Sequence, residues 1–121
     1  IQYNEPGLDL PNTPFERVER PDKMVICGDF NFTLDSVSYQ RMTAPFSDKI
    51  PDLFDAWNVV NPDGNRSPTC GVFDHKQWKN GPHCRDYFFL SENFIQQIQT
   101  ISVNTDTNAS DHQPIRLTLK V

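Results

Sequence analysis

The segment from residue 85 to residue 91, RDYFFLS, constrains the fold more than any other part of the chain. Successive side chains of a strand point to opposite faces, so Phe88 and Leu90 cannot share a face with Phe89. A strand this apolar needs cover on at least one face, as strands in layered folds have. The sequence therefore predicts a sheet packed against another layer, with these three side chains in the core.

Other segments also have strand patterns. Residues 24–32, MVICGDFNF, begin with a short apolar run that closes at Gly28, which predicts a buried strand with Cys27 as a small core residue. Residues 114–121 alternate cleanly, residues 95–105 alternate loosely, and a strand near 69–73 is possible. We expect one mainly antiparallel sheet of about four or five strands, a common sheet size.

Two segments favour short helices, which makes the predicted fold class α/β. Residues 35–43 form a candidate helix capped by Asp35 or Ser36. Residues 51–58, PDLFDAWN, place Pro51 at a plausible first helical position and space their apolar side chains as an amphipathic helix would. We expect both helices on one face of the sheet.

Proline divides the chain into two parts. Residues 1–22 contain Pro6, Pro11, Pro14 and Pro21, which predicts an extended arm or linker, and residues 23–121 form the folded part. The chain has 121 residues, which fits one domain or a part of one. It has no apolar window long enough for a transmembrane helix, and its three cysteines argue against a disulfide framework. The compartment stays open, with a cytoplasmic location favoured.

The formal net charge of −5 argues against a protein that binds nucleic acid non-specifically, because such binding uses clustered Lys and Arg. It fits a site that handles phosphate through a cation held by carboxylates. The stretch Gly28–Asn31 offers such a group: Asp29 and Asn31 are two residues apart at a strand end, which places both on one face with Phe30 turned into the core. The pair could hold a nucleophilic water and a phosphate oxygen. The alternative is an ordinary polar turn.

Asp111 and His112 stand just before the last predicted strand. Histidine is the usual general base near neutral pH, and a carboxylate that accepts its ring N–H fixes the tautomer. Asp86 is a candidate for that carboxylate because it opens the aromatic strand. The alternative is that Asp111 and His112 belong to an ordinary polar loop.

The order GDFN, DYFFLS, SDHQP resembles the C-terminal signature of the endonuclease/exonuclease/phosphatase superfamily, over roughly residues 22–121. The resemblance implies half of a four-layer α/β sandwich and water attack on the phosphorus of a nucleic acid, a nucleotide or a phospho-metabolite. It implies that Asp29 positions the water, Asn31 binds a phosphate oxygen and Asp86 orients His112. His112 would be the base or would stabilise developing charge, and Asp111 with Asp29 would bind Mg²⁺ or Mn²⁺.

Two departures from the family pattern stand out. Many relatives have Arg where this chain has Cys84, and here Arg85 directly precedes Asp86. The family's N-terminal half, with its metal-binding Glu, an Asn and another catalytic His, is not recognisable. We therefore expect that half to be a partner of this chain, and apolar sheet surface to lack cover without it. We also expect the isolated chain to be inactive and capable of self-association.

Three alternatives remain at this stage. The chain could be an inactive binding module of the same fold. It could be a small zinc-binding module, with ligands drawn from Cys70, His75, His83 and Cys84. Trp78, with Lys76 and Lys79, could form a substrate-contact loop or a plain surface loop anchored by one aromatic residue.

Overall fold

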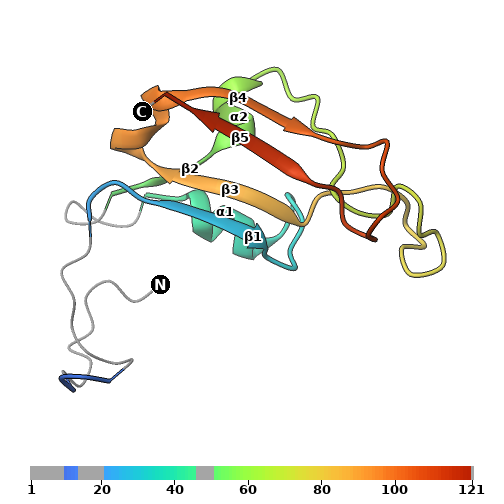
Figure 1. The fold of residues 1–121 in the computed structure, drawn as a ribbon, viewed down its shortest axis with the longest axis horizontal. Coiled ribbons are helices and arrows are strands. Elements are labelled where there is room, and N and C mark those ends of the chain that lie inside the picture. The colour runs from blue at the N-terminus through green and yellow to red at the C-terminus, as the bar shows by residue number, and fades with distance from the viewer. Residues whose placement is uncertain (1–9, 14–20, 46–50, 121) are drawn as a thin grey trace.

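The computed structural model describes residues 10–13, 21–45 and 51–120 (Figure 1). Most of the predicted arm, residues 1–9 and 14–20, lies outside the described residues, so the arm stays a prediction. Within the described part the elements follow one another as β1 (Val25–Asp29), α1 (Val37–Thr43), β2 (Leu53–Asp55), α2 (Ala56–Val60), β3 (Asp86–Ser91), the 3₁₀ helix η1 (Glu92–Gln97), β4 (Ile98–Val103) and β5 (Ile115–Leu119). None of the helices in this part is long and apolar enough to cross a membrane.

The described strands form two antiparallel sheets. One has the order β1-β3-β2 and the other pairs β4 with β5. The α/β class with antiparallel strands and short helices is confirmed, but the expectation of one sheet of about four or five strands was wrong. Both edges of β3 are already taken by β1 and β2, so the chain turns through η1, and β4 pairs with β5 in a second layer (Figure 1).

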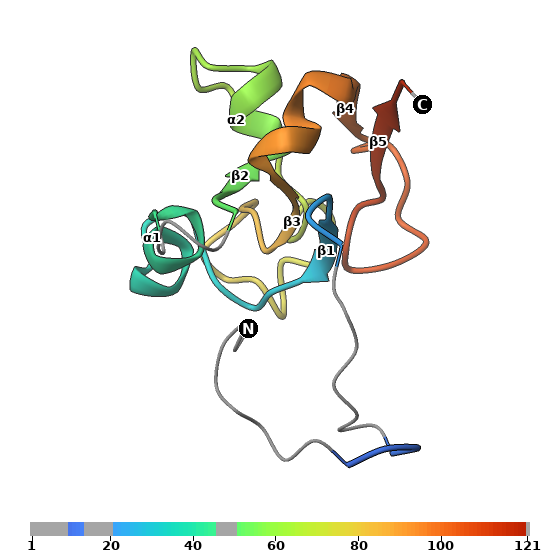
Figure 2. The same cartoon turned by 90° about the vertical axis from the view of Figure 1, so that its left-hand side faces the viewer.

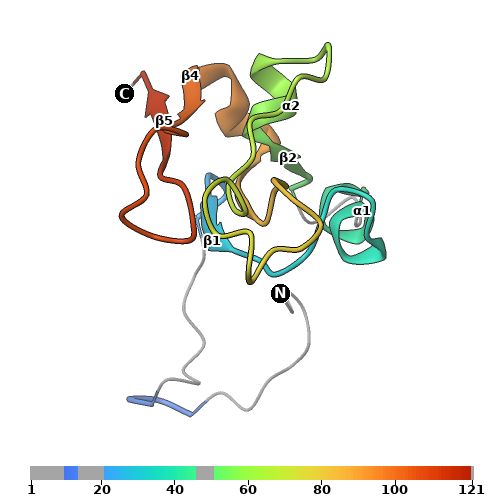
Figure 3. The ribbon, with the colours of Figure 1, turned by 90° about the vertical axis from the view of Figure 1, so that its right-hand side faces the viewer.

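The aromatic strand β3 packs on both of its faces, and of the three side chains predicted in the core Phe89 and Leu90 are buried, whereas Phe88 is not. Tyr87 and Phe89 are 1% and 0% exposed and pack with Tyr39 of α1 in one cluster. Leu90 is also fully buried. Phe88 is half-buried and lines a small cavity with Val103, Ile115 and other residues. The end-on views show α1 beside the three-stranded sheet, with α2 close to β4 at the other side (Figures 2 and 3).

The β4–β5 layer is less closely covered than β3 in the described part of the chain. The apolar side chains of β4 and β5, among them Ile101, Val103 and Leu117, are only half-buried. A groove of about 590 Å³ runs beside Phe88 and is lined by residues of the two strands, including Val103 and Leu117.

Three local expectations need correction or refinement. The helix predicted over 51–58 is wrong in its first half: Leu53–Asp55 is a strand and the helix begins at Ala56. Leu53 and Phe54 pair with β3, and the side chain of Asp55 caps the helix by accepting from the Trp57 N–H. The possible strand near 69–73 is reduced to isolated bridges at Cys70, and residues 95–97 belong to η1. The predicted helix at 35–43 is present as α1, with Ser36 as its N-cap.

The predicted burial of Cys27 was wrong, because β1 is an edge strand and Cys27 is exposed. Cys70 and Cys84 are buried. Burial and the charge of Asp86 raise the pKa of the Cys70 thiol to about 11, and burial raises the pKa of the Cys84 thiol. Both thiols therefore stay protonated and shielded near neutral pH, whereas Cys27 is reachable from solvent.

We therefore expect one of the three thiols to react quickly with Ellman's reagent in native buffer at pH 8, and all three in denaturant. Cys27→Ser should abolish the fast phase and leave the slow ones. Fast reaction of a second thiol in native protein would contradict the burial of Cys70 and Cys84.

Candidate active site

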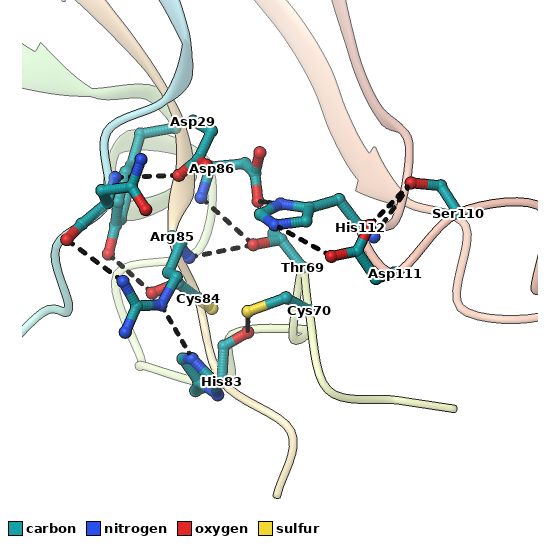
Figure 4. Close-up of polar contacts among 12 residues, drawn as sticks. Asp29, Thr69, Cys70, His83, Cys84, Arg85, Asp86, Ser110, Asp111 and His112 are labelled. Carbon is teal, nitrogen blue, oxygen red and sulfur yellow. Dashed lines mark hydrogen bonds and ion pairs between the residues drawn. The ribbon is translucent and has the colours of Figure 1, made fainter. Parts of the chain in front are cut away.

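Three of the sequence-predicted residues, Asp29, Asp86 and His112, come together where β1 ends and β3 begins. β1 ends at Asp29, β3 starts at Asp86, and the two are direct partners in the antiparallel register. His112 approaches from the loop before β5 (Figure 4). The end of one antiparallel strand necessarily lies beside the start of its partner, which is why residues 57 positions apart in the chain become neighbours.

Asp29, Asp86 and His112 each offer one ligand atom within 4.8 Å of the others. Within the described part of the chain this is the one group of three acidic, His or Cys residues that could hold a metal ion. His112 Nδ1 lies 2.8 Å from Asp86 Oδ2, and their side chains are 24% and 17% exposed. Like charges opposite one another on paired strands repel, and a cation between Asp29 and Asp86 would offset that cost.

Asn31 lies beyond the end of β1, in a turn. Its backbone has a φ of 55°, and its N–H donates to Asp29 Oδ1 at 2.8 Å. The strand alternation that would place Asp29 and Asn31 on one face therefore stops at Asp29. Phe30 does pack against the core, as expected. The two interpretations of residues 28–31, a polar turn and a part of the site, are therefore compatible, because the backbone of the turn holds the Asp29 carboxylate by a hydrogen bond.

Asp111 lies outside the group of three. One of its carboxylate oxygens, Oδ2, is 3.9 Å from His112 Nε2, and the side chain is 41% exposed. It accepts hydrogen bonds from Gln77 Nε2 and Ser110 Oγ, each at 3.3 Å. Asp86 and Asp111 therefore flank opposite nitrogens of the His112 ring. The role of Asp111 as a metal ligand stays a prediction.

Thr69 holds the site together and was not foreseen. It is 2% exposed, and its hydroxyl accepts from the backbone N–H groups of Arg85 and Asp86 at 3.0 and 3.1 Å. Its carbonyl accepts from Gln113 N–H at 2.7 Å, next to His112. One buried Thr therefore fixes the start of β3 and the loop of His112. A single Thr in a turn-rich segment has no pattern that could predict this.

Comparison with known proteins agrees with this geometry. A sequence model of the Endonuclease/Exonuclease/phosphatase family matches residues 7–112. The chain belongs to this family. Its members are hydrolases, namely nucleases and phosphatases, and the α/β arrangement with antiparallel sheets fits a partial domain of their fold.

An exodeoxyribonuclease of Bacillus subtilis (strain 168) is similar to the chain, with 25% identity over 124 residues. The alignment covers 86% of this chain and 47% of the relative. The chain therefore spans about half the length of this curated relative.

The structure does not support the alternative of a zinc site in this chain. The Cys70 and Cys84 thiols donate to the carbonyl oxygens of His83 and Ser67, at 3.5 and 3.2 Å. His83 Nδ1 lies 2.8 Å from the carbonyl oxygen of Gly81, within hydrogen-bond distance. In the described part of the chain, the ligand atoms of Cys70, His75, His83 and Cys84 do not gather into a group of three that could hold an ion.

The loop from residue 71 to residue 84 forms one wall of the site. The Trp78 ring lies 4.9 Å from the His83 ring and 6.0 Å from the His112 ring, centre to centre. The guanidinium carbon of Arg85 lies 4.9 Å from the centre of the Trp78 ring. Arg85 and the two His rings thus surround Trp78, so a stacking role on substrate would use only the remaining surface of this ring.

The base of this loop is closed by two close contacts. Cys70 pairs with His83 in a bridge and also with His112. Gly71 has a φ of +73°, and a Cβ there would lie 2.7 Å from the Gly81 carbonyl oxygen. Only glycine fits this crossing without moving the backbone.

Proposed function

We propose that the protein is a divalent-metal-dependent phosphodiesterase that hydrolyses nucleic acid by attack of water on phosphorus. The observation that carries the proposal is the contact between His112 and Asp86, 2.8 Å, directly beside the Asp29 carboxylate. The similarity to an exodeoxyribonuclease supports a polynucleotide substrate over a small phosphate ester.

The residues present fit a hard divalent cation such as Mg²⁺ or Mn²⁺. Carboxylate oxygens are the ligands such ions prefer, and Asp29 and Asp86 bring two carboxylates together. Asp29 Oδ1 accepts from the Asn31 N–H, and Asp86 Oδ2 accepts from His112 Nδ1. The second oxygen of each carboxylate is therefore left for a cation. A bound cation would neutralise phosphoryl oxygens and make a bound water more acidic.

Each residue of the site has a separate role in the proposed reaction. An ionised Asp86 only accepts hydrogen bonds, so it holds the proton on His112 Nδ1 and leaves Nε2 as the base for the attacking water. Asp29 orients that water, and the Asn31 amide supplies a neutral donor to a phosphate oxygen. Asp111 Oδ2, which lies 3.9 Å from Nε2, would stabilise the imidazolium that forms after proton transfer.

The test is hydrolysis of bis-p-nitrophenyl phosphate, p-nitrophenyl phosphate and a labelled oligodeoxynucleotide by the purified full-length protein. We expect turnover of the two diesters with Mg²⁺ or Mn²⁺, loss of turnover with EDTA, and recovery when the ion is returned. Preference for the monoester would show a phosphatase instead. Binding of DNA without turnover under all conditions would favour the inactive binding module.

A further inference from the structure

Arg85 is held in place by neutral groups only. Its Nε–H donates to His83 Nε2 at 3.0 Å, and Nη1–H donates to the carbonyl of Asn31 at 3.1 Å. The guanidinium stacks over the Trp78 ring. His83 Nδ1–H donates to the Gly81 carbonyl oxygen. Nε2 can accept from Arg85 only when it carries no proton, which describes the neutral ring. A guanidinium fixed in this way keeps its position without an acidic partner.

This arrangement differs from that of Arg66, a second partly buried Arg. Arg66 binds both carboxylate oxygens of Asp55 at 2.7 Å, and its charge is balanced inside the protein. Arg85 makes no ion pair with any described residue. Guanidinium has five donors, of which these contacts use two, so its fork remains open to an anion. Phosphate is the anion whose geometry this fork matches best.

The direction of the side chain separates it from the reaction centre. Arg85 directly precedes Asp86, yet its guanidinium points away from the Asp86–His112 pair and toward His83 (Figure 4). The Trp78 ring lies 4.9 Å from the Arg85 guanidinium carbon and 6.0 Å from the His112 ring, so it borders both groups. A phosphate bound at Arg85 is therefore distinct from one attacked beside His112, and only a substrate with several phosphates can fill both places.

We infer that Arg85 binds a flanking phosphate of a polynucleotide whose neighbouring diester is cleaved at Asp29, Asp86 and His112. This inference rests on the proposed function and narrows its substrate to a chain with more than one phosphate. Lys76 and Lys79, both exposed, add positive charge to the adjoining loop, in a protein whose net charge is −5.

The first test compares two substrates. Arg85→Ala in the full-length protein should lower kcat/KM for an oligodeoxynucleotide about 10-fold to 100-fold more than kcat/KM for bis-p-nitrophenyl phosphate, which has no second phosphate. Most of the extra loss should lie in KM. Arg85→Lys should recover part of the affinity, since a point charge remains but the planar fork is lost. Lys120→Ala, an exposed cation at the opposite end of β5, should keep the wild-type ratio.

The second test measures binding without hydrolysis. In EDTA, affinity for a fluorescent duplex DNA is measured by anisotropy between 50 and 200 mM salt, roughly the range over which phosphate contacts are resolved. The slope of log K against log salt should become shallower by about 0.9 in Arg85→Ala, because one phosphate contact is lost, and stay at the wild-type value in Lys120→Ala.

The outcomes separate the two proposals. Equal losses on both substrates with an unchanged salt slope would show that Arg85 only supports the Asn31 turn, and the inference would be overturned while the proposed function stands. If the wild type hydrolyses neither substrate, the proposed function fails. The salt slope then still decides whether Arg85 contacts phosphate.

Discussion

Replacing His112 with alanine in the full-length protein is expected to lower kcat/KM for a phosphodiester by about 10²-fold to 10⁴-fold, the usual contribution of a general base. The side chain is partly exposed at the end of a loop, so its loss leaves no large cavity and the fold should survive. Asp29→Ala should have a loss of the same order, because it removes one of the two carboxylates, Asp29 and Asp86, that could hold the cation. The measurement is hydrolysis of bis-p-nitrophenyl phosphate with Mg²⁺, beside thermal unfolding of each variant.

Matched controls make this result specific. His75→Ala removes an exposed imidazole in the neighbouring loop and should retain wild-type turnover. Asp86→Asn should lower kcat and change the pH profile, because an amide can donate to Nδ1 and favour the wrong tautomer. Near-wild-type turnover of His112→Ala would remove the base from the proposed mechanism.

The second large effect concerns stability. Asp55 is 3% exposed and lies at the centre of a buried network: it binds Arg66 in a bidentate pair, accepts from Tyr39 Oη at 2.9 Å and caps α2 through Trp57 N–H. Asp55→Ala leaves the Arg66 guanidinium buried without its counter-charge. Removal of one partner of such a pair typically costs about 3–5 kcal/mol. We expect a loss of that size in urea unfolding, large against the whole stability of a domain.

Asp63→Ala is the matched control for this experiment, because Asp63 is exposed in the turn after α2 and should change stability by less than about 0.5 kcal/mol. The double variant Asp55→Ala, Arg66→Ala should be less destabilised than the sum of the two single variants, since the unpaired charge is then gone. Additive effects, or a loss below about 1 kcal/mol for Asp55→Ala, would contradict the buried ion pair as a determinant of the fold.

The sequence predicted those features that depend on short-range pattern. Aromatic density identified β3, alternation identified β5, and the capping preference of Asp35 or Ser36 marked the start of α1, where Ser36 is the cap. The strand-end positions of Asp29 and Asp86 also followed from pattern, because both border apolar runs. The order of the three motifs led to the family, which the comparison confirms.

Features that depend on pairing between distant segments were missed. Leu53 and Phe54 have helix-compatible spacing, but a free edge of β3 recruits them into a strand. Cys27 belongs to an apolar run, but its strand lies at an edge of the sheet. Thr69 acts through Arg85, 16 positions away, and Arg85 contacts the carbonyl of Asn31, 54 positions away, and no local window contains either contact. The roles of Thr69 and Arg85 depend on contacts between different loops, which the sequence of a single loop does not predict.

The close crossing of Gly71 and Gly81 makes the loop that carries Trp78 a separable module. Its two ends are tied together at the Cys70–His83 bridge, next to Asp86 and His112, while its outer part, which includes His75 and Lys76, is exposed. Insertions at the outer part would lengthen the wall over the substrate without moving the reacting groups. A side chain at Gly71 would instead push the two ends of the loop apart and displace Trp78. In the proposed enzyme, changes in the outer part of the loop would therefore alter which substrates fit, while Asp29, Asp86 and His112 stay in place.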